Sequence, residues 1–355
     1  MATSPQLVEQ TIRHQVFLER MKTGEANQYA DFLREIDRSI RFRLSGEDLT
    51  QFTRQRLDRL IGAVDSDIAA IYDRFWDELD GRLDDVAQYE AGFESRSINQ
   101  VLNNFETVIP SADQIRAAVI AAPLSVRGPD GGKLLEAFYR DWTEVERQRI
   151  GGAVRQGFFE GQTNAQIIRA IRGTKAGNYS DGLLAINNRN AEAVVRTAVQ
   201  HVASVARQET WNANPGLVRT VRWVSTLDSR TTQICRSLDQ TVYPVNKGPR
   251  PPIHIRCRST TVAELDGRFD FLKKGATRSS SEGPVSADLT YYAWLKRQPT
   301  KFQEAAIGKS RAKLLRDGGL TAERFAELNL GRNFNPLTLD EMRRIEPLAF
   351  ERANL

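Results

Sequence analysis

The sequence has 355 residues, of which 40% are hydrophobic and 27% are charged, with a formal net charge of +5. That length allows two or three domains with a sizeable core, and the composition is typical of a soluble protein with no apolar run long enough to span a membrane. Two cysteines exclude a disulfide scaffold, and residues 1–6 lack the basic and apolar regions of a secretory signal, so we expect folding in a cytoplasm.

The charge is unevenly distributed along the chain. Residues 1–120 carry 14 basic and 21 acidic side chains, a balance of −7. Residues 121–239 have a balance of +5 and residues 240–355 a balance of +7. This charge asymmetry favours two different partners, and a polyanion such as nucleic acid is a candidate partner for the basic part. The alternative is that the charges only form an ordinary solvated surface.

The first 120 residues are predicted to form long helices. Apolar side chains recur at intervals of three and four from Leu57 to Val86, which predicts an amphipathic helix of about eight turns. A helix of this length favours a bundle, within the chain or with another subunit. His14 lies in a polar segment and is predicted to be solvated. Aspartates on the other face of the long helix predict a solvated acidic surface: Asp58, Asp65, Asp67, Asp73, Asp77, Asp80 and Asp84.

Turn residues and helical periods alternate in the middle of the chain. Glycines and prolines between residues 123 and 133 predict a linker, and a helical pattern resumes from residue 135 towards 158. A short helix follows, with Thr163 or Asn164 as its N-cap and Gly173 as its end.

A small sheet is predicted after the next helix. Apolar residues from 191 to 205 indicate a helix that ends near residue 212, with His201 at the margin of its apolar face as a core-edge histidine. The alternating pattern of residues 218–224 predicts a strand, with partners at 242–243 and 259–262.

The remaining residues complete the predicted organisation. Residues 275–287 have the composition of a flexible tether, and short helices are predicted beyond it. The predicted regions are a helical N-terminal part (1–125), a small α+β domain (126–266), a linker (267–287) and a basic helical C-terminal segment (288–355). The fold class is mainly α, with long N-terminal helices and a helical bundle next to a short antiparallel sheet.

Both cysteines and one of the three histidines lie between residues 223 and 258. Asp228 follows the predicted strand and can accept backbone N–H bonds that cap the helix carrying Cys235. Two prolines predict an extended entry to His254. His254 and Cys257 are three residues apart, so a turn can direct both towards a point shared with Cys235.

Three interpretations of this cysteine and histidine region remain open. Zinc would bind both thiolates and the imidazole, with water or a carboxylate such as Asp228 or Asp239 as fourth ligand, although structural zinc sites usually have four Cys or His ligands. A disulfide between Cys235 and Cys257 would close a loop of about 20 residues and contribute about 3 kcal/mol. A reduced, buried pair of cysteines beside a hydrogen-bonded His254 requires neither.

Catalysis is not predicted, although His254 with Asp228 could imitate a general-base pair and either cysteine could be a nucleophile. The sequence contains no nucleophile elbow, phosphate-binding glycine loop or metalloprotease helix motif. We therefore expect a structural site, no catalytic residue and no cofactor, with zinc as the alternative.

With these residues in view, residues 130–265 resemble the phage head morphogenesis family, also described as phage Mu protein F-like minor head proteins. Family members often have a further cysteine three residues before Cys235, where this sequence has Thr232, which removes a fourth metal ligand. The motif residues that carry the resemblance are Arg196, Trp223, Asp228, Arg230, Thr231, Cys235, Pro251, Pro252, His254, Cys257 and Arg258.

The resemblance implies a structural minor head protein of a tailed bacteriophage, made in the host cytoplasm and incorporated in several copies into the virion, inside the capsid or at the portal vertex. The implied partner is the portal protein, with capsid or scaffold proteins and packaged DNA as further candidates and no membrane partner. It would act in head assembly, DNA packaging or ejection. The alternative is a zinc-dependent hydrolase or nuclease delivered with the phage DNA.

Overall fold

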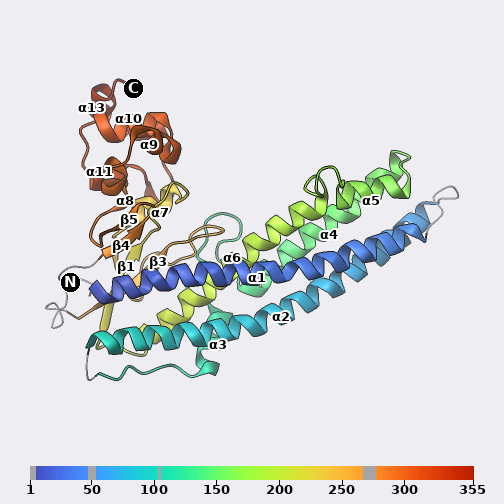
Figure 1. Cartoon of the computed structure of the whole chain (residues 1–355), viewed down its shortest axis with the longest axis horizontal. Coiled ribbons are helices and arrows are strands. Elements are labelled where there is room, and N and C mark those ends of the chain that lie inside the picture. The colour runs from blue at the N-terminus through green and yellow to red at the C-terminus, as the bar shows by residue number, and fades with distance from the viewer. Residues whose placement is uncertain (1–4, 47–52, 103–104, 267–276) are drawn as a thin grey trace. The chain divides into compact units, whose positions relative to one another are not determined.

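The computed structural model describes residues 5–46, 53–102, 105–266 and 277–355, which form two compact units (Figure 1). We call them the sheet unit (Met1–Leu18, Tyr89–Ser111 and Ser204–Leu355) and the helical unit (Glu19–Gln88 and Ala112–Ala203). The longest helices, α1 (Pro5–Ser45), α2 (Arg54–Leu102) and α6 (Leu183–Asn212), contribute to both units.

The shorter elements follow in chain order. The other helices are α3 (Ala112–Ala121), α4 (Leu135–Phe159), α5 (Asn164–Arg172), α7 (Gln233–Leu238), α8 (Tyr291–Lys296), α9 (Thr300–Ile307), α10 (Lys309–Asp317), α11 (Ala322–Leu328), α12 (Leu339–Ile345) and α13 (Pro347–Arg352), with a 3₁₀ turn η3 (Arg332–Phe334). The strands are β1 (Val218–Val224), β2 (Val242–Pro244), β3 (Thr260–Leu265), β4 (Thr277–Ser280) and β5 (Gly283–Ser286). The prediction of a mainly α protein with a small α+β part is confirmed.

The helical unit is a bundle in which α1 and α2 run antiparallel. The hydroxyls of Tyr29 and Tyr72 are 2.9 Å apart in its core, and Trp76 of α2 stacks on Tyr139 of α4 with ring centroids 4.2 Å apart. The apolar positions predicted from the period of the long helix are buried because they face these neighbours. The predicted helix is confirmed and extends over 49 residues.

The aspartate face of α2 is only partly solvated, in contrast to the prediction. Three of its members are held by arginines of neighbouring helices, because those helices pack beside α2. The pairs are Asp65 with Arg147, Asp67 with Arg43 and Asp84 with Arg116.

Local signals placed the short helix α5 correctly. Thr163 is its N-cap and forms a reciprocal capping box with Gln166. Gly173 ends the helix with a φ of 93°, a conformation that favours glycine. Residues 122–134 connect α3 to α4 without helix or strand, as the glycines and prolines predict.

The sheet unit contains a three-stranded antiparallel sheet in the order β2-β1-β3. Val221 of the central strand lies opposite Tyr243 on one side and Ala263 on the other. The inner face packs in one hydrophobic core with apolar side chains from the ends of the long helices, among them Leu7, Ile98 and Trp211. This core fixes β1 and β3, the strands that flank the segment containing Cys235, His254 and Cys257.

The C-terminal helices have their own core, which corrects the prediction for the segment before them. Tyr292, Trp294 and Phe325 are fully buried among α8–α13. Residues 277–286, expected to be part of a flexible tether, instead form the antiparallel hairpin β4–β5. Arg278 of this hairpin is fully buried and so anchors it, while the expected linker residues 267–276 lie outside the described part.

Two histidines are buried. The prediction of a solvated His14 is wrong: its side chain stacks on Phe93 at 3.7 Å, and its Nε2 lies 2.5 Å from Oε1 of Glu90. The segment around His14 is polar, but Phe93 and Glu90 of the neighbouring helix α2 cover the imidazole. His201 is buried as predicted, and burial lowers its pKa to about 4. Among the described helices, none is long and apolar enough to cross a membrane.

Candidate functional site

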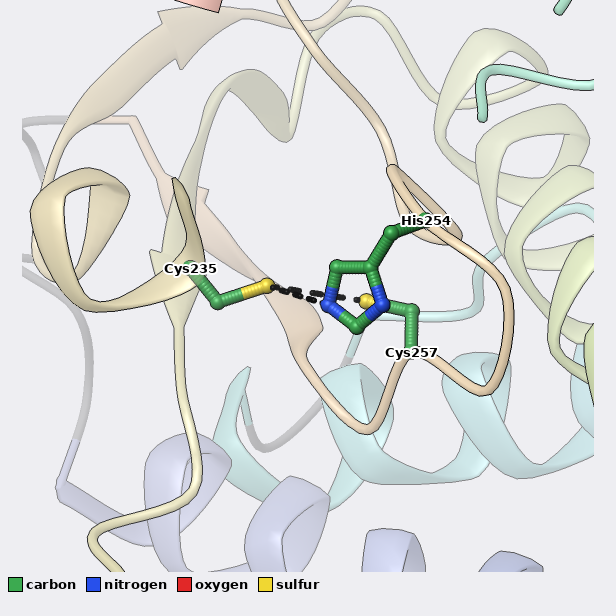
Figure 2. A group of neighbouring side chains, drawn as sticks. All are labelled: Cys235, His254 and Cys257. Atoms are coloured by element: carbon green, nitrogen blue, oxygen red, sulfur yellow. Dashed lines mark hydrogen bonds between the residues drawn. The ribbon is translucent and has the colours of Figure 1, made fainter. Parts of the chain in front are cut away.

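Cys235, His254 and Cys257 meet at one point in the sheet unit (Figure 2). Cys235 comes from α7, and the other two come from the loop before β3. The Sγ atom of Cys235 is 3.2 Å from Nε2 of His254 and 3.8 Å from Sγ of Cys257. The spacing in sequence predicted this meeting, and the structure shows it.

The local fold positions each of these side chains. Pro251 and Pro252, joined by a cis peptide bond, lead into a turn in which the amide of Cys257 donates to the carbonyl of His254 at 3.1 Å. Trp223 of β1 lies fully buried in the same small core as both cysteines. Its Nε1 donates to Oγ of Ser225 at 2.9 Å, and that hydroxyl donates to the carbonyl of Cys235 at 2.6 Å. The backbone of Cys235 is thus attached to the sheet through buried hydrogen bonds.

Both cysteines are buried free thiols with unequal acidity. Burial raises the pKa of Cys235 well above its ordinary value, and the neighbouring Cys257 raises it further. Burial also acts to raise the pKa of Cys257, but hydrogen bonds from Cys235 and His254 lower it well below its ordinary value. Burial acts to lower the pKa of His254, but its interactions with Cys257 and with the carbonyl of Ile255 raise it above the ordinary value.

The distances test the disulfide and the zinc interpretations. A disulfide requires sulfurs about 2.05 Å apart, whereas these sulfurs are 3.8 Å apart. Zinc–sulfur bonds of about 2.3 Å at tetrahedral angles place two thiolate sulfurs about 3.8 Å apart, and a zinc-bound nitrogen about 3.5 Å from each sulfur. Two thiolates and one imidazole are donors that zinc prefers, and their donor atoms lie within 4.8 Å of one another, so the residues fit a zinc ion.

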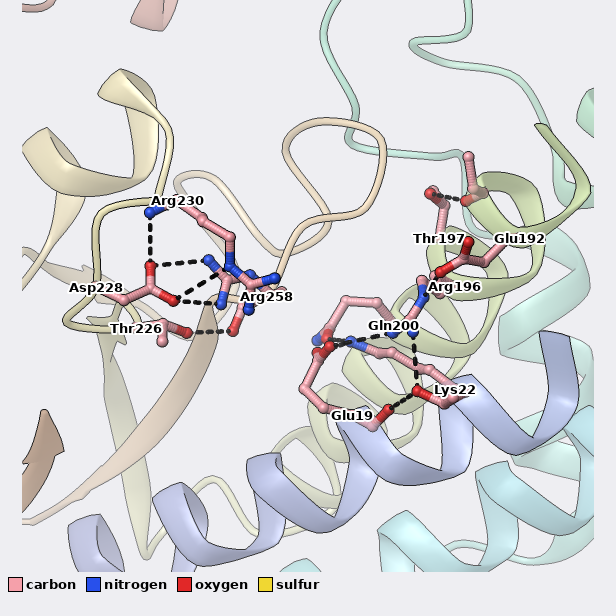
Figure 3. Close-up of polar contacts among 12 residues, drawn as sticks. Glu19, Lys22, Glu192, Arg196, Thr197, Gln200, Thr226, Asp228, Arg230 and Arg258 are labelled. Carbon is pink, nitrogen blue, oxygen red and sulfur yellow. Dashed lines mark hydrogen bonds and ion pairs between the residues drawn. The ribbon is translucent and has the colours of Figure 1, made fainter. Parts of the chain in front are cut away.

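Asp228 does not join this cluster, although it was a candidate fourth ligand. Its carboxylate accepts from both terminal nitrogens of Arg258, at 2.7 and 2.9 Å, and from the amide of Arg230 at 3.0 Å (Figure 3). The amide of Thr231 also donates to it at 3.0 Å. Burial acts to raise its pKa, but the bonds from Arg258 lower it below the ordinary value. The predicted cap of the cysteine helix is also corrected, since Asp228 orders the preceding turn and Thr232 is the N-cap of α7.

Asp239, the other candidate carboxylate, is engaged by a residue that sequence reasoning missed. Its oxygens accept from the guanidinium of Arg278 at 2.9 and 3.0 Å, and Oδ1 also accepts from the amide of Ser225 at 2.8 Å. Arg278 further donates to the carbonyl of Ser225. Arg278 lies in a serine-rich stretch, so no local pattern marked it as a buried residue.

Arg196, the remaining charged motif residue, lies on α6 in the helical unit. Its Nε donates to Glu192 at 2.8 Å and its Nη2 to the hydroxyl of Thr23 at 2.8 Å (Figure 3). One turn further along α6, Gln200 accepts from the buried Lys22 at 2.5 Å. These contacts join α6 to α1 inside that unit.

A comparison with protein families matches the part of the chain that contains the motif residues. Residues 148–262 match the family model described as Phage Mu protein F like protein. Neither a curated protein nor a solved structure matches the chain. The matched residues contain every motif residue from Arg196 to Arg258. The predicted resemblance is thereby confirmed for residues 148–262, which are a phage Mu protein F-like domain.

Proposed function

We propose that the protein is a structural minor head protein of a tailed bacteriophage that binds the portal protein and acts in head assembly, DNA packaging or ejection. The match of residues 148–262 to the family carries this proposal. The motif supports a structural role, since Asp228 bonds to Arg258 and the cysteines are buried beside Trp223. Capsid or scaffold proteins and packaged DNA are further candidate partners in the virion.

Co-purification from assembling phage heads tests the portal association. We expect the tagged full-length protein to retain the portal protein through washing and to remain in purified heads. Purified heads that contain the portal but lack this protein would overturn the proposal.

We further propose that zinc is bound by Cys235, His254 and Cys257 as a structural clip. When bound, zinc would supply strong bonds between a short helix and a loop that are otherwise joined by weak thiol contacts. Both thiols are 1% exposed, which suits a structural ion better than one that must admit a substrate. Water or a nearby hydroxyl would complete the coordination, since Asp228 and Asp239 are held by arginines.

A zinc-dependent hydrolase or nuclease is the second candidate. The observation that favours it is the ligand set itself, because catalytic zinc sites characteristically have three protein ligands and one open position. In that case the domain would bind zinc through the same three residues, and an activity would depend on the metal.

Metal analysis of the purified protein separates these candidates. We expect about one zinc ion per chain, loss of most of it in Cys257→Ser, and tighter retention against a chelator in Thr232→Cys, which adds a thiolate one helical turn before Cys235. Zinc without activity on DNA or ester substrates supports the clip, whereas an activity lost on chelation and restored by zinc supports the enzyme. A protein prepared with zinc that retains none would contradict both.

A further inference from the structure

A groove in the helical unit is formed by α2, α3 and α4 and has a volume of about 690 Å³. Its buried floor includes the stacked rings of Trp76 and Tyr139 and the side chain of Leu83. Volumes of this order are typical of binding sites rather than of packing defects.

The described residues neutralise only part of the negative charge along one wall of the groove. Six carboxylates and three arginines line it, and each arginine already has a carboxylate partner there: Arg116 with Asp84, Arg140 with Glu136, and Arg147 with Glu144. Asp73, Asp77 and Asp80 form no ion pair among the described residues. They lie four and three residues apart on α2 and therefore form a row about 6 Å and then about 4.5 Å apart along the helix axis.

The row carries an electrostatic cost in the absence of a cation. Partial desolvation, together with the neighbouring Asp84 and Asp77, raises the pKa of Asp80 to about 6. A cationic group beside the row would reverse this effect, because it favours the ionised carboxylates.

A buried polar group at the floor is a second, independent sign of an occupant. Tyr139 is 3% exposed, and its hydroxyl has no hydrogen-bond partner among the described residues. The adjacent Trp76 shows the usual situation, since its Nε1 donates to the hydroxyl of Thr143 at 2.8 Å. Buried polar groups are normally paired, so this unpaired hydroxyl distinguishes the floor of the groove from an ordinary packed core.

The rim adds exposed apolar surface. Ile120 of α3 is 60% exposed and Leu134, just before α4, is 44% exposed, and both line the groove. A partner that covers them must therefore combine apolar and cationic side chains. A small inorganic cation has no apolar surface and would leave Ile120 and Leu134 exposed.

We propose that this groove binds a short amphipathic segment of another head protein, with lysine or arginine side chains along Asp73, Asp77 and Asp80 and apolar side chains against the floor and rim. Main-chain and apolar contacts would supply affinity, and the aspartate row would select the charge and register of the segment. The inference rests on the proposed function for its partner in the head, and it specifies the surface and the chemistry of that partner.

Photocrosslinking in assembling heads tests where the segment binds. A benzoylphenylalanine residue replaces Ile120 in the full-length protein, and the same residue at Phe159, which is 71% exposed on α4 and does not line the groove, is the control. We expect crosslinking from position 120 to a segment of one head protein that carries lysine or arginine beside apolar residues. Equal crosslinking from both positions, or a crosslinked segment without basic residues, would overturn the proposal.

Charge reversal tests the aspartate row. The Asp77→Lys variant is expected to reduce incorporation into heads about tenfold, because it places a cation against the cationic segment. The matched control is Asp58→Lys, an exposed aspartate of the same helix that does not line the groove. A thermal melting temperature of purified Asp77→Lys close to that of the unmodified protein shows that folding is intact. If the unmodified protein enters heads and folded Asp77→Lys enters equally well, the groove proposal alone fails; absence of the unmodified protein from heads contradicts the proposed function instead.

Discussion

At the scale of single residues, Asp228 connects two parts of the motif that are 30 positions apart in the chain. Its carboxylate orders the turn before α7 through two amides and holds Arg258 next to Cys257. The motif residues are thus linked to one another by charge-assisted hydrogen bonds, which are stronger than neutral ones. This explains chemically how the motif maintains the loop that carries the second cysteine.

Replacing Asp228 is expected to make the protein less stable at neutral pH. Asp228→Ala should lower the free energy of unfolding by about 2 to 3 kcal/mol, because it leaves the mostly buried Arg258 without its partner. The folded state lowers the pKa of Asp228, so this contribution is present above the unfolded pKa of about 4 and is lost as the pH falls through the folded value. Urea unfolding at several pH values should show the difference between variant and unmodified protein shrinking in acid. A difference that stays constant with pH would contradict this assignment.

Removing one partner of the Arg278–Asp239 pair should destabilise the protein more than removing Asp228, since the two side chains are 1% and 0% exposed. Arg278→Ala is expected to lower the free energy of unfolding by about 3 to 5 kcal/mol, because the buried carboxylate of Asp239 then lacks its counter-charge. The control is Arg219→Ala, whose side chain is 67% exposed in its pair with Asp266 and should contribute at most about 1 kcal/mol. Denaturant unfolding that gives equal losses for both variants would show that the buried pair has no special role.

At the scale of elements, helices were predictable where the apolar period is long and the caps are local. The positions of α2, α4 and α5 agree with the prediction because the period and the Thr163 cap are properties of neighbouring residues. The β4–β5 hairpin was missed, since its serines and glycine are typical of a linker and its main anchor is the distant Asp239.

α4 and α5 pack closely because residue 157 of α4 is a glycine. A Cβ atom at Gly157 would lie 2.6 Å from Cγ1 of Ile167, so Gly157→Val is expected to separate the helices and cost about 1 to 3 kcal/mol. Gly152 of the same helix has no atom within 4 Å of such a Cβ. Gly152→Ala should therefore stabilise the protein by about 0.5 to 1 kcal/mol through helix propensity. Thermal unfolding of the two variants should show shifts of opposite sign, and shifts of the same sign would contradict this packing.

At the scale of the whole molecule, the basic character of residues 240–355 leads to a prediction about DNA. Part of this charge is used internally, as at Arg278, but Arg297, Lys301 and Lys309 are exposed. We expect the purified protein to bind duplex DNA weakly, with an affinity that falls at least about tenfold as salt rises from about 50 to about 200 mM, because phosphate contacts release counterions. Binding measured by fluorescence anisotropy that ignores salt would contradict phosphate recognition.

The sequence by itself determined the long helices, the strand of residues 218–224, the spacing that lets Cys235, His254 and Cys257 meet, and the resemblance of residues 148–262 to a phage Mu protein F-like domain. Each of these depends on periods, caps or spacings within short stretches. Only the tertiary structure decided that His14 is buried against Glu90, that Asp228 bonds to Arg258, and that an acidic row borders a groove. These features join residues from separate elements. Their partners are chosen by how helices and strands pack, which no local pattern of residues encodes.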